Sequence, residues 1–262
     1  MNLINKETNT CPSVIHANGN SKKQDITIWD TLVSSFRNTN PIPNKLDQSL
    51  SIITLKGGRY KNDKTILEET CEKYGIALKI LPWPDNNNFW EASKAKNYEL
   101  LNAIDKGDIT TKYIMPLDCT DVILLKHPND ILSDYLRIFP NTGSVWNGET
   151  NDWPRFNLPK YVHHPILDSY LKKVSDRDVE ISRTSKSKFV FLNSGASIGL
   201  TDKLRTFYKT SLDLYARVKT NDQAMARTSQ YILSEEHTID IHCKIFQCLY
   251  GTNKGQFEVN HE

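Results

Sequence analysis

The sequence predicts an α/β fold with a mostly parallel central sheet. Short apolar runs alternate with amphipathic segments that end at glycine or proline, which is the pattern of strands alternating with helices. No internal repeat and no Gly/Ser- or Pro-rich linker divides the 262 residues, and 38% of them are hydrophobic, enough to fill a sizeable core. We therefore expect a single, Rossmann-like domain over residues 1–262.

The alternation is clearest in the first half of the chain. Strands are expected at 50–55, 76–81 and 112–117, and helices around 67–74, 93–106 and 128–139. Gly75 and Gly107 stand where the first two helices should end, and Pro140 stops the third. The second half predicts a strand at 189–192 that runs into a turn at 193–195, helices that begin at 201 and 221, and an edge strand over 239–246.

Composition excludes several classes of protein. The net charge is +2, from 33 basic and 31 acidic residues, so neither nucleic acid nor a membrane is expected as a partner. The sequence shows no secretory signal and no apolar run of ~18 residues, so a cytoplasmic or viral setting is expected. Five cysteines without a CxxC pair favour reduced thiols, and one bridge such as Cys11–Cys243 stays open.

The segment "YIMPLDCTDVILL" carries the strongest chemical signal. Asp118 and Asp121 stand three apart directly after the strand expected at 112–117. Ligands of parallel sheets bind at the carboxyl ends of strands, and oxygen ligands suit Mg²⁺ or Mn²⁺. These carboxylates are therefore candidate metal ligands, although a solvated turn would have the same residues.

Other candidate residues are weaker when each is taken alone. The turn Asn193-Ser194-Gly195 offers hydrogen bonds to a sugar, and its glycine would let a ligand approach the backbone. Asp222 opens a helix, where an acidic side chain often only complements the helix dipole. His16 in "SVIHANGN" ends a short strand, which by itself favours a structural histidine. Three tryptophans in Pro- or Asn-rich loops have rings that can stack on a sugar or a base: Trp83, Trp90 and Trp153.

The order of these motifs resembles the glycosyltransferase domain of the procollagen lysyl hydroxylase/glycosyltransferase family. "LDCTDVILL" is similar to the family's metal motif, "DWP" to its Cys-Trp-Pro segment, "FLNSGASIG" to its Leu-Asn-Ser-Gly-Gly-Phe-Ile-Gly, and "NDQ" to its Asp-Asp-Gln. "IDIHCKIFQCLYG" is similar to a further family strand. The resemblance covers residues 50–251, which would form the body of a GT-A fold.

The resemblance implies an activity and a set of site residues. Members of the family move glucose or galactose from a UDP-sugar onto hydroxylysine or galactosyl-hydroxylysine of collagen and use Mn²⁺. By resemblance, Asp118 and Asp121 would be Mn²⁺ ligands and Trp153 would lie over the active site. The remaining roles would be a phosphate contact from Lys94, with Lys96 as the alternative, nucleotide contacts from Thr54 and Lys56, sugar and acceptor contacts from Asn193, Ser194 and Gly195, and a general base, Asp222.

Three departures from the family pattern are visible. The glycines ahead of the family's UDP-contacting lysine are absent from "FWEASKAK", Thr120 stands where the family has an aromatic residue, and the acidic run is reduced to Asn221-Asp222. The family's Pro-x-Val-His-Gly-Asn-Gly motif, whose histidine is a metal ligand, normally closes the domain. Here it corresponds to "CPSVIHANG" at the start of the chain. Either residues 1–40 are the displaced closing segment of a circularly permuted domain, or the chain is a segment cut in register from a longer, for example tandem, protein.

The displaced histidine motif leads to an expectation about the geometry of the folded chain. His16 should complete the metal site with Asp118 and Asp121, and the two ends of the chain should be neighbours. We expect a hexosyltransferase with a UDP-sugar donor and a protein or glycan acceptor. Two alternatives stay open, namely a GT-A transferase that acts on a glycan or lipid and a non-catalytic domain that binds a UDP-sugar.

Overall fold

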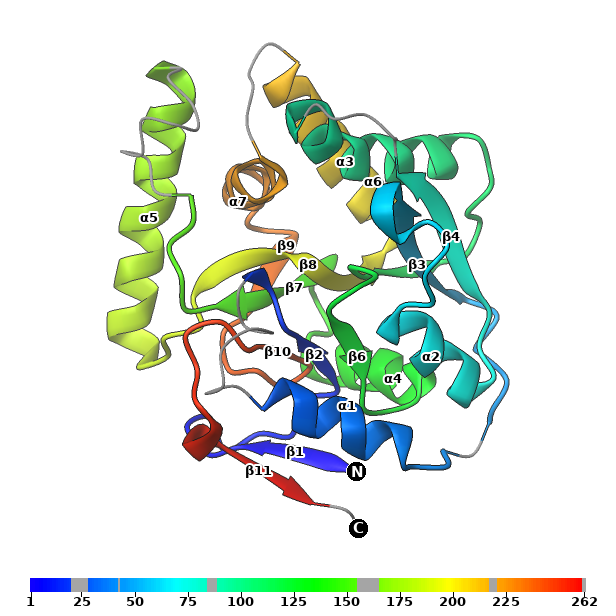
Figure 1. The fold of residues 1–262 in the computed structure, drawn as a ribbon. Coiled ribbons are helices and arrows are strands. Elements are labelled where there is room, and N and C mark those ends of the chain that lie inside the picture. Colours follow the sequence, from blue (N-terminus) through cyan, green and yellow to red (C-terminus); the bar gives the residue numbers. More distant parts are fainter. Residues whose placement is uncertain (20–27, 42, 84–88, 155–164, 217–220, 261–262) are drawn as a thin grey trace.

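The computed structural model describes residues 1–19, 28–41, 43–83, 89–154, 165–216 and 221–260 (Figure 1). Its largest feature is a six-stranded sheet with the order β4-β3-β5-β8-β7-β9. The strands are β3 (Leu50–Gly57), β4 (Leu78–Trp83), β5 (Tyr113–Pro116), β7 (Ser144–Glu149), β8 (Phe191–Leu200) and β9 (His237–Asp240). All run in the same direction except β8, which is antiparallel to both of its neighbours. The α/β fold class with a mostly parallel central sheet is therefore confirmed.

The first half of this sheet is Rossmann-like. The chain passes from β3 outward to β4 and then returns to the other side of β3 to form β5. Successive connections thus leave β3 in opposite directions, which creates a switch point at the carboxyl ends of β3 and β5. Ligands of open α/β sheets bind at such a point.

Two small sheets complete the strands. β10 (Phe246–Cys248), β2 (Val14–His16) and β6 (Val122–Leu124) form one sheet, in which β2 lies in the middle, parallel to β10 and antiparallel to β6. β1 (Asn2–Asn5) pairs with β11 (Phe257–Asn260) in the other. This second pairing brings the two ends of the chain side by side, as Figure 1 shows.

Helices cover both faces of the central sheet (Figure 1). They are α1 (Trp29–Arg37), α2 (Ile66–Tyr74), α3 (Phe89–Asp105), α4 (Pro128–Ile138), α5 (Pro165–Ser185), α6 (Thr201–Tyr215) and α7 (Asp222–Ile232), with short 3-10 turns η2 (Gly58–Tyr60) and η3 (Lys254–Gln256). One apolar core joins the sheet to α1, α2 and α4, a second joins it to α3, α6 and α7, and a third, smaller one lies between α5, α6 and α7. Adjacent residues of β3 serve different cores, because Ile52 packs in the first and Ile53 in the second.

Local signals explain where the predicted helices begin and end. Thr65 caps α2 in a capping box with Glu68, so each side chain satisfies a backbone N–H of the first turn. Gly75 ends α2 with a φ of 70° and Gly107 follows α3 with a φ of 76°, a left-handed conformation that favours glycine. Both glycines stand where the sequence placed the helix ends.

The second half differs from expectation in several places, and β7 and β11 have no counterpart among the predicted strands. The segment 193–195 is not a turn, because β8 continues through it to Leu200. The strand expected over 239–246 is divided into β9 and β10, which belong to different sheets. The carboxylate of Asp240 accepts hydrogen bonds from the backbone N–H groups of Lys244, Ile245 and Phe246, and these bonds close the turn between the two strands. The long helix α5 was not anticipated, since charged and polar residues dominate its sequence.

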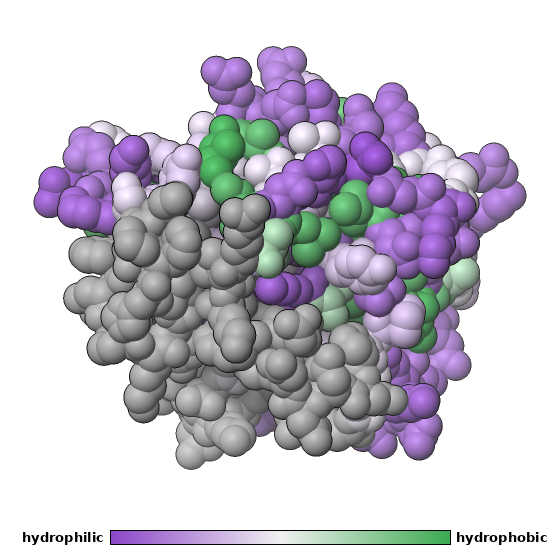
Figure 2. Space-filling view, turned by 90° about the horizontal axis from the view of Figure 1, so that it is seen from above, coloured by the Kyte–Doolittle hydropathy of each residue, from purple (hydrophilic) through white to green (hydrophobic). Residues whose placement is uncertain are grey.

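The surface and the thiols agree with a folded globular chain. None of the five cysteines, all of which fall in the described ranges, forms a disulfide, so the open Cys11–Cys243 bridge is absent. The coloured part of the face shown in Figure 2 is mostly hydrophilic, with small hydrophobic patches among the hydrophilic residues. No helix in the described part of the chain is both long and apolar enough to cross a bilayer.

The pairing of β1 with β11 makes a first testable prediction. Leu3 is fully buried in the core beside this pairing, while its neighbour Asn2 is exposed. We expect Leu3→Ala to lower the free energy of unfolding by about 2–5 kcal/mol through lost burial and a residual cavity. Asn2→Ala serves as the matched control and should leave urea denaturation curves nearly unchanged. Equal stability of the two variants would show that β1 does not pack as described.

Candidate functional site

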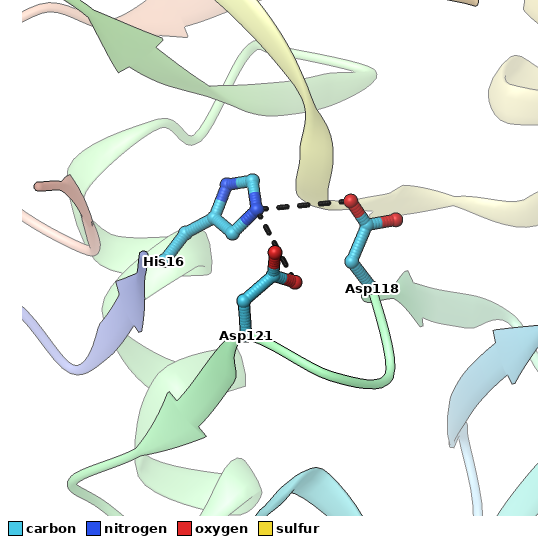
Figure 3. A group of neighbouring side chains, drawn as sticks. All are labelled: His16, Asp118 and Asp121. Atoms are coloured by element: carbon cyan, nitrogen blue, oxygen red, sulfur yellow. Dashed lines mark ion pairs between the residues drawn. The ribbon is translucent and has the colours of Figure 1, made fainter. Parts of the chain in front are cut away.

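Three side chains from distant parts of the chain meet at the switch point of the sheet (Figure 3). His16 ends β2, and Asp118 and Asp121 lie in the turn between β5 and β6. The Nε2 atom of His16 lies 3.7 Å from Oδ2 of Asp118 and 3.6 Å from Oδ1 of Asp121. The structure thus brings together the three residues that the sequence grouped as metal ligands, although about a hundred residues separate them.

Backbone pairing fixes this geometry. In the antiparallel pair of β2 and β6, His16 lies opposite Val122, the residue after Asp121. The N–H of Ala17 donates to the carbonyl of Asp121, and the N–H of Asp118 donates to the carbonyl of Gly195 on β8 (both 2.8 Å). The imidazole packs against Gly195 so closely that a Cβ there would lie 2.0 Å from Cε1 of His16. Only glycine therefore fits at position 195.

The cluster has the properties of a divalent-cation site. Two adjacent corners of an octahedron, with ligands ~2.0–2.6 Å from the ion, lie about 3–4 Å apart, which agrees with the His16–carboxylate distances. Those distances are too long for good hydrogen bonds, and the buried Nε2 atom has no hydrogen-bond partner within the described residues. Carboxylates suit Mg²⁺ and Mn²⁺, whereas imidazole suits softer first-row metals, so one histidine with two aspartates fits Mn²⁺ better than Mg²⁺. The residues present therefore fit such an ion.

Acidic side chains and one buried lysine lie together at the cluster. Burial works against protonation of His16, but Asp121 and Asp118 outweigh it and raise the pKa of the imidazole. The buried Lys96 of α3 donates from Nζ to Oδ1 of Asp118 (2.6 Å) and to the carbonyl of Ser194 (2.7 Å). Burial would lower the pKa of Lys96, yet Asp118 and Asp222 raise it and keep the group cationic. A fixed cation thus lies beside the three aspartates.

Two cavities meet at this cluster, and Asp118, Asp121 and Asp222 line both. The first has a volume of 380 Å³ and is mainly apolar, with walls from the ends of β3 and β4 and from the β5–β6 turn. Leu55, Gly57, Gly58, Tyr60, Trp83, Lys96, Leu117, Cys119 and Thr120 form the rest of its lining. The second has a volume of 470 Å³ and is more polar. His16, Asn18, Gly19, Glu149, Asn151, Trp153, Asn193, Ser194, Gly195, Gln223 and Tyr250 form the rest of that lining.

An irregularity in β8 directs polar groups into the second cavity. The register between β7 and β8 shifts after Trp146, so that Asn147 lies opposite Asn193 while Trp146 lies opposite Ser197. The intervening residues bulge toward the cluster, as bulges near functional sites commonly do. Ser194 donates from Oγ to Oδ2 of Asp222 (2.9 Å), and its backbone N–H donates to Oε1 of Gln223 (2.8 Å). The bulge therefore joins β8 to the first turn of α7.

Glu149, at the end of β7, is a central residue of this cavity that the sequence analysis did not identify. Its buried carboxylate accepts hydrogen bonds from the side-chain amides of Asn18 (2.9 Å), Asn193 (3.3 Å) and Gln223. Burial raises the pKa of Glu149 to about 7, against the opposing effect of the Asn193 and Asn18 hydrogen bonds. The available signal was its place at the carboxyl end of a buried strand, four residues before Trp153.

The structure places the other expected residues as follows. Asn193, Ser194, Gly195, Trp153 and Asp222 line the second cavity. Lys96, the alternative to Lys94, reaches the cluster, whereas Lys94 is two positions earlier on α3 and therefore on a different side of the helix, and it lines neither cavity.

The two expected nucleotide contacts on β3 have other partners. Thr54 is buried and donates to the carbonyl of Leu117 (2.7 Å), and Lys56 forms an ion pair with Glu68 (2.8 Å). Neither is among the described residues that line the cavities. Of the three loop tryptophans, Trp83 and Trp153 line cavities, and the side chain of Trp90 lies outside the described residues.

Fold and site together define an α/β protein with a candidate divalent-cation site between an apolar and a polar cavity. No family model matches the chain. The uncharacterized protein R699 of Acanthamoeba polyphaga mimivirus is 24% identical over 218 residues, which are 79% of this chain and 41% of that protein. This chain thus spans about two fifths of the length of the curated relative it matches.

Two solved structures share a distant likeness with the chain. A glycosyltransferase involved in the glycosylation of the major capsid of PBCV-1 is 14% identical, with a TM-score of 0.45 over 79% of this chain and 95% of that chain. The bifunctional glycosyltransferase WbbM in its apo form is 8% identical, with a TM-score of 0.44 over 76% of this chain and 40% of that chain.

The raised pKa of Glu149 makes a prediction about stability. An acid with a pKa near 4.5 when unfolded and about 7 when folded binds more protons in the folded state, so its contribution to stability is lost as the pH rises from about 4.5 to 7. Glu149→Gln should remove about 3 kcal/mol of this pH dependence between pH 4 and pH 8. Urea denaturation at several pH values measures it, with the exposed Glu180→Gln as the control. If the free energy of unfolding depended on pH in Glu149→Gln as it does in the wild type, the buried Glu149 carboxylate would not be the source of this dependence.

Proposed function

We propose that this chain is a metal-dependent glycosyltransferase that moves glucose or galactose from a UDP-sugar to an acceptor hydroxyl. The carrying observation is the convergence of His16, Asp118 and Asp121 between an apolar cavity with aromatic walls and a polar cavity lined by carboxylates and amides. A nucleotide-sugar has the matching sequence of parts, namely a flat base, a diphosphate and a polar sugar. The resemblance to the lysyl hydroxylase/glycosyltransferase family supports the same assignment and suggests hydroxylysine or galactosyl-hydroxylysine as the acceptor.

The displaced histidine motif belongs to this proposal. β2 lies early in the chain, yet in space it lies between β10 and β6 and is parallel to β10. In the family's motif order the histidine motif follows the Ile-Phe-Gln strand, which corresponds to β10, and here β2 and β10 are parallel neighbours. We therefore interpret the motif order as a circular permutation.

The residues around the cluster have distinct proposed tasks. His16, Asp118 and Asp121 would hold Mn²⁺, which when bound supplies positive charge against a departing diphosphate. Lys96 is a buried, cationic side chain at the same place and is suited to donate to a phosphate oxygen. The two positive groups would thus lie at the junction of the cavities, where the bond between sugar and phosphate breaks.

The polar cavity would hold the sugar and the acceptor. Transfer forms a bond between the acceptor oxygen and the anomeric carbon, and the acceptor proton must pass to a base. Asp222 is our candidate, because it lines both cavities and accepts a hydrogen bond from Ser194. Glu149 already accepts from three amides with its two oxygens, so we assign it the task of holding Asn18, Asn193 and Gln223 in place.

Loss of one metal ligand tests the proposed chemistry. UDP release should be measured with a panel of UDP-sugars, with and without Mn²⁺, and with a panel of acceptors that includes collagen-like peptides. We expect Asp121→Asn to reduce Mn²⁺-dependent turnover by more than about 100-fold, since the site loses a charged ligand. Asp105→Asn, which removes an exposed carboxylate paired with Arg205, is the control. Full turnover in Asp121→Asn would refute the metal assignment, and UDP binding by the wild type without turnover would favour a binding domain.

Trp83 offers a second test, because Thr120 replaces the family's aromatic residue in the metal motif. Trp83 ends β4 beside Gly57 and lines the apolar cavity, where its ring can stack on the base. Base–aromatic stacking is worth ~1–3 kcal/mol, so Trp83→Ala should weaken UDP binding by about 5- to 150-fold. Calorimetry with UDP measures the loss, and Trp83→Phe should recover part of it. Equal affinity of the two variants would exclude stacking at this position.

A further inference from the structure

Arg227 on α7 is a completely buried arginine with two aspartate partners. Its Nη1 atom lies 2.7 Å from Oδ1 of Asp152, and its Nη2 atom lies 3.1 Å from Oδ2 of Asp178. The guanidinium also lies over the ring of Phe191, 5.4 Å from its centroid. A buried guanidinium carries a large desolvation penalty, and hydrophobic residues of similar volume often stabilise a fold equally well. Its position between several elements indicates a task other than stability.

The two aspartates belong to different elements. Asp178 is fully buried on α5 and is also paired with Arg177 (2.7 Å). Asp152 lies in the irregular segment that follows β7, and its Oδ1 atom also accepts a hydrogen bond from Ser175 of α5 (3.1 Å). The Nη1 atom of Arg227 additionally donates to the carbonyl of Pro154 (3.4 Å). One guanidinium therefore ties the segment after β7 to both α5 and α7.

This segment presents alternate residues to opposite sides. Asn151 and Trp153 line the polar cavity, whereas Asp152 between them is directed to Arg227. The helix that carries Arg227 begins with Asp222 and Gln223, which line the same cavity. The ion pair between Arg227 and Asp152 thus sets the distance between Trp153, which lines one side of the polar cavity, and the start of α7.

We infer that Asp152 and Arg227 are positioning residues that hold Trp153 against the polar cavity. This inference rests on the proposed function only for its kinetic consequence. Arginine suits the task because its planar fork engages two carboxylates at once, which a lysine ammonium cannot do with the same geometry. The family's Cys-Trp-Pro segment has a cysteine, not a carboxylate, before its tryptophan, so the ion pair between Asp152 and Arg227 is a feature of this chain.

Asp152→Ala is the informative variant. It removes the ion pair between Arg227 and the segment that carries Trp153. Arg227 stays paired with Asp178, so the buried guanidinium keeps a carboxylate partner. The side chain of Asp152 is 19% exposed, and we expect the variant to fold with a melting temperature within a few degrees of the wild type. The control is Asp176→Ala, which removes an exposed carboxylate of α5 that pairs with Lys172.

The first readout needs no activity. Acrylamide quenching of tryptophan emission is measured in each variant with and without Trp153→Phe, and the difference isolates Trp153. We expect the quenching constant of Trp153 to rise at least about two-fold in Asp152→Ala and to stay unchanged in Asp176→Ala. An unchanged quenching constant in Asp152→Ala would overturn the inference, whether or not the wild type transfers sugar.

The second readout separates positioning from general damage. Asp152→Ala should lower kcat by about 10-fold or more, while the affinity for UDP changes less than about two-fold and the KM for the UDP-sugar changes less than kcat, because the apolar cavity proposed for the nucleotide is untouched. Equal losses in all three, with a lower melting temperature, would show a merely structural role and overturn the inference. A wild type that transfers no sugar would refute the proposed function, and the quenching result would still decide the positioning role.

Discussion

The antiparallel pairing of β2 with β6 is the interaction on which the site depends. It sets His16 opposite Val122 and therefore beside Asp121. Because side chains alternate between the two faces of a strand, a slip by one residue would turn the imidazole away from both carboxylates. Gly195 sets a second limit, since its missing side chain leaves the space that the imidazole fills. Register and close packing together decide whether the three candidate ligands meet.

Around this cluster, side-chain hydrogen bonds hold the ends of β7, β8 and α7 in place where regular secondary structure is interrupted. The bulge of β8, the end of β7 and the start of α7 meet at Glu149 and Gln223, whose polar groups are buried and paired. Unpaired groups at such depth would cost stability, so the arrangement has few alternatives. The raised pKa of Glu149 indicates that even the paired carboxylate is held at a cost, a common property of functional sites.

The sequence predicted those parts that depend on local patterns. β3, α2, β4, α3, β5 and α4 follow from apolar periodicity and from end signals such as Gly75 and Gly107, whereas β1 and α1 were not predicted. The meeting of His16 with Asp118 and Asp121 depends on pairing across the chain, which leaves no local pattern, and only the resemblance of motifs made it predictable. Glu149 has only a weak signal in the sequence, its place at the end of an apolar run before Trp153, and its burial depends on packing against β8 and α7. The choice between Lys94 and Lys96 required the rotation of α3 about its axis, which a sequence fixes poorly.

The distribution of the thiols has a practical consequence. Cys71, Cys243 and Cys248 are buried, and burial raises the pKa of the half-buried Cys119 to about 11, so these groups react slowly with alkylating reagents. Cys11 is exposed and follows Thr10, which forms a bridge with Asn5 at the end of β1. A maleimide dye would therefore attach at one place, between β1 and the strand that carries His16. Its emission would report local opening of this N-terminal region while both cavities stay unmodified.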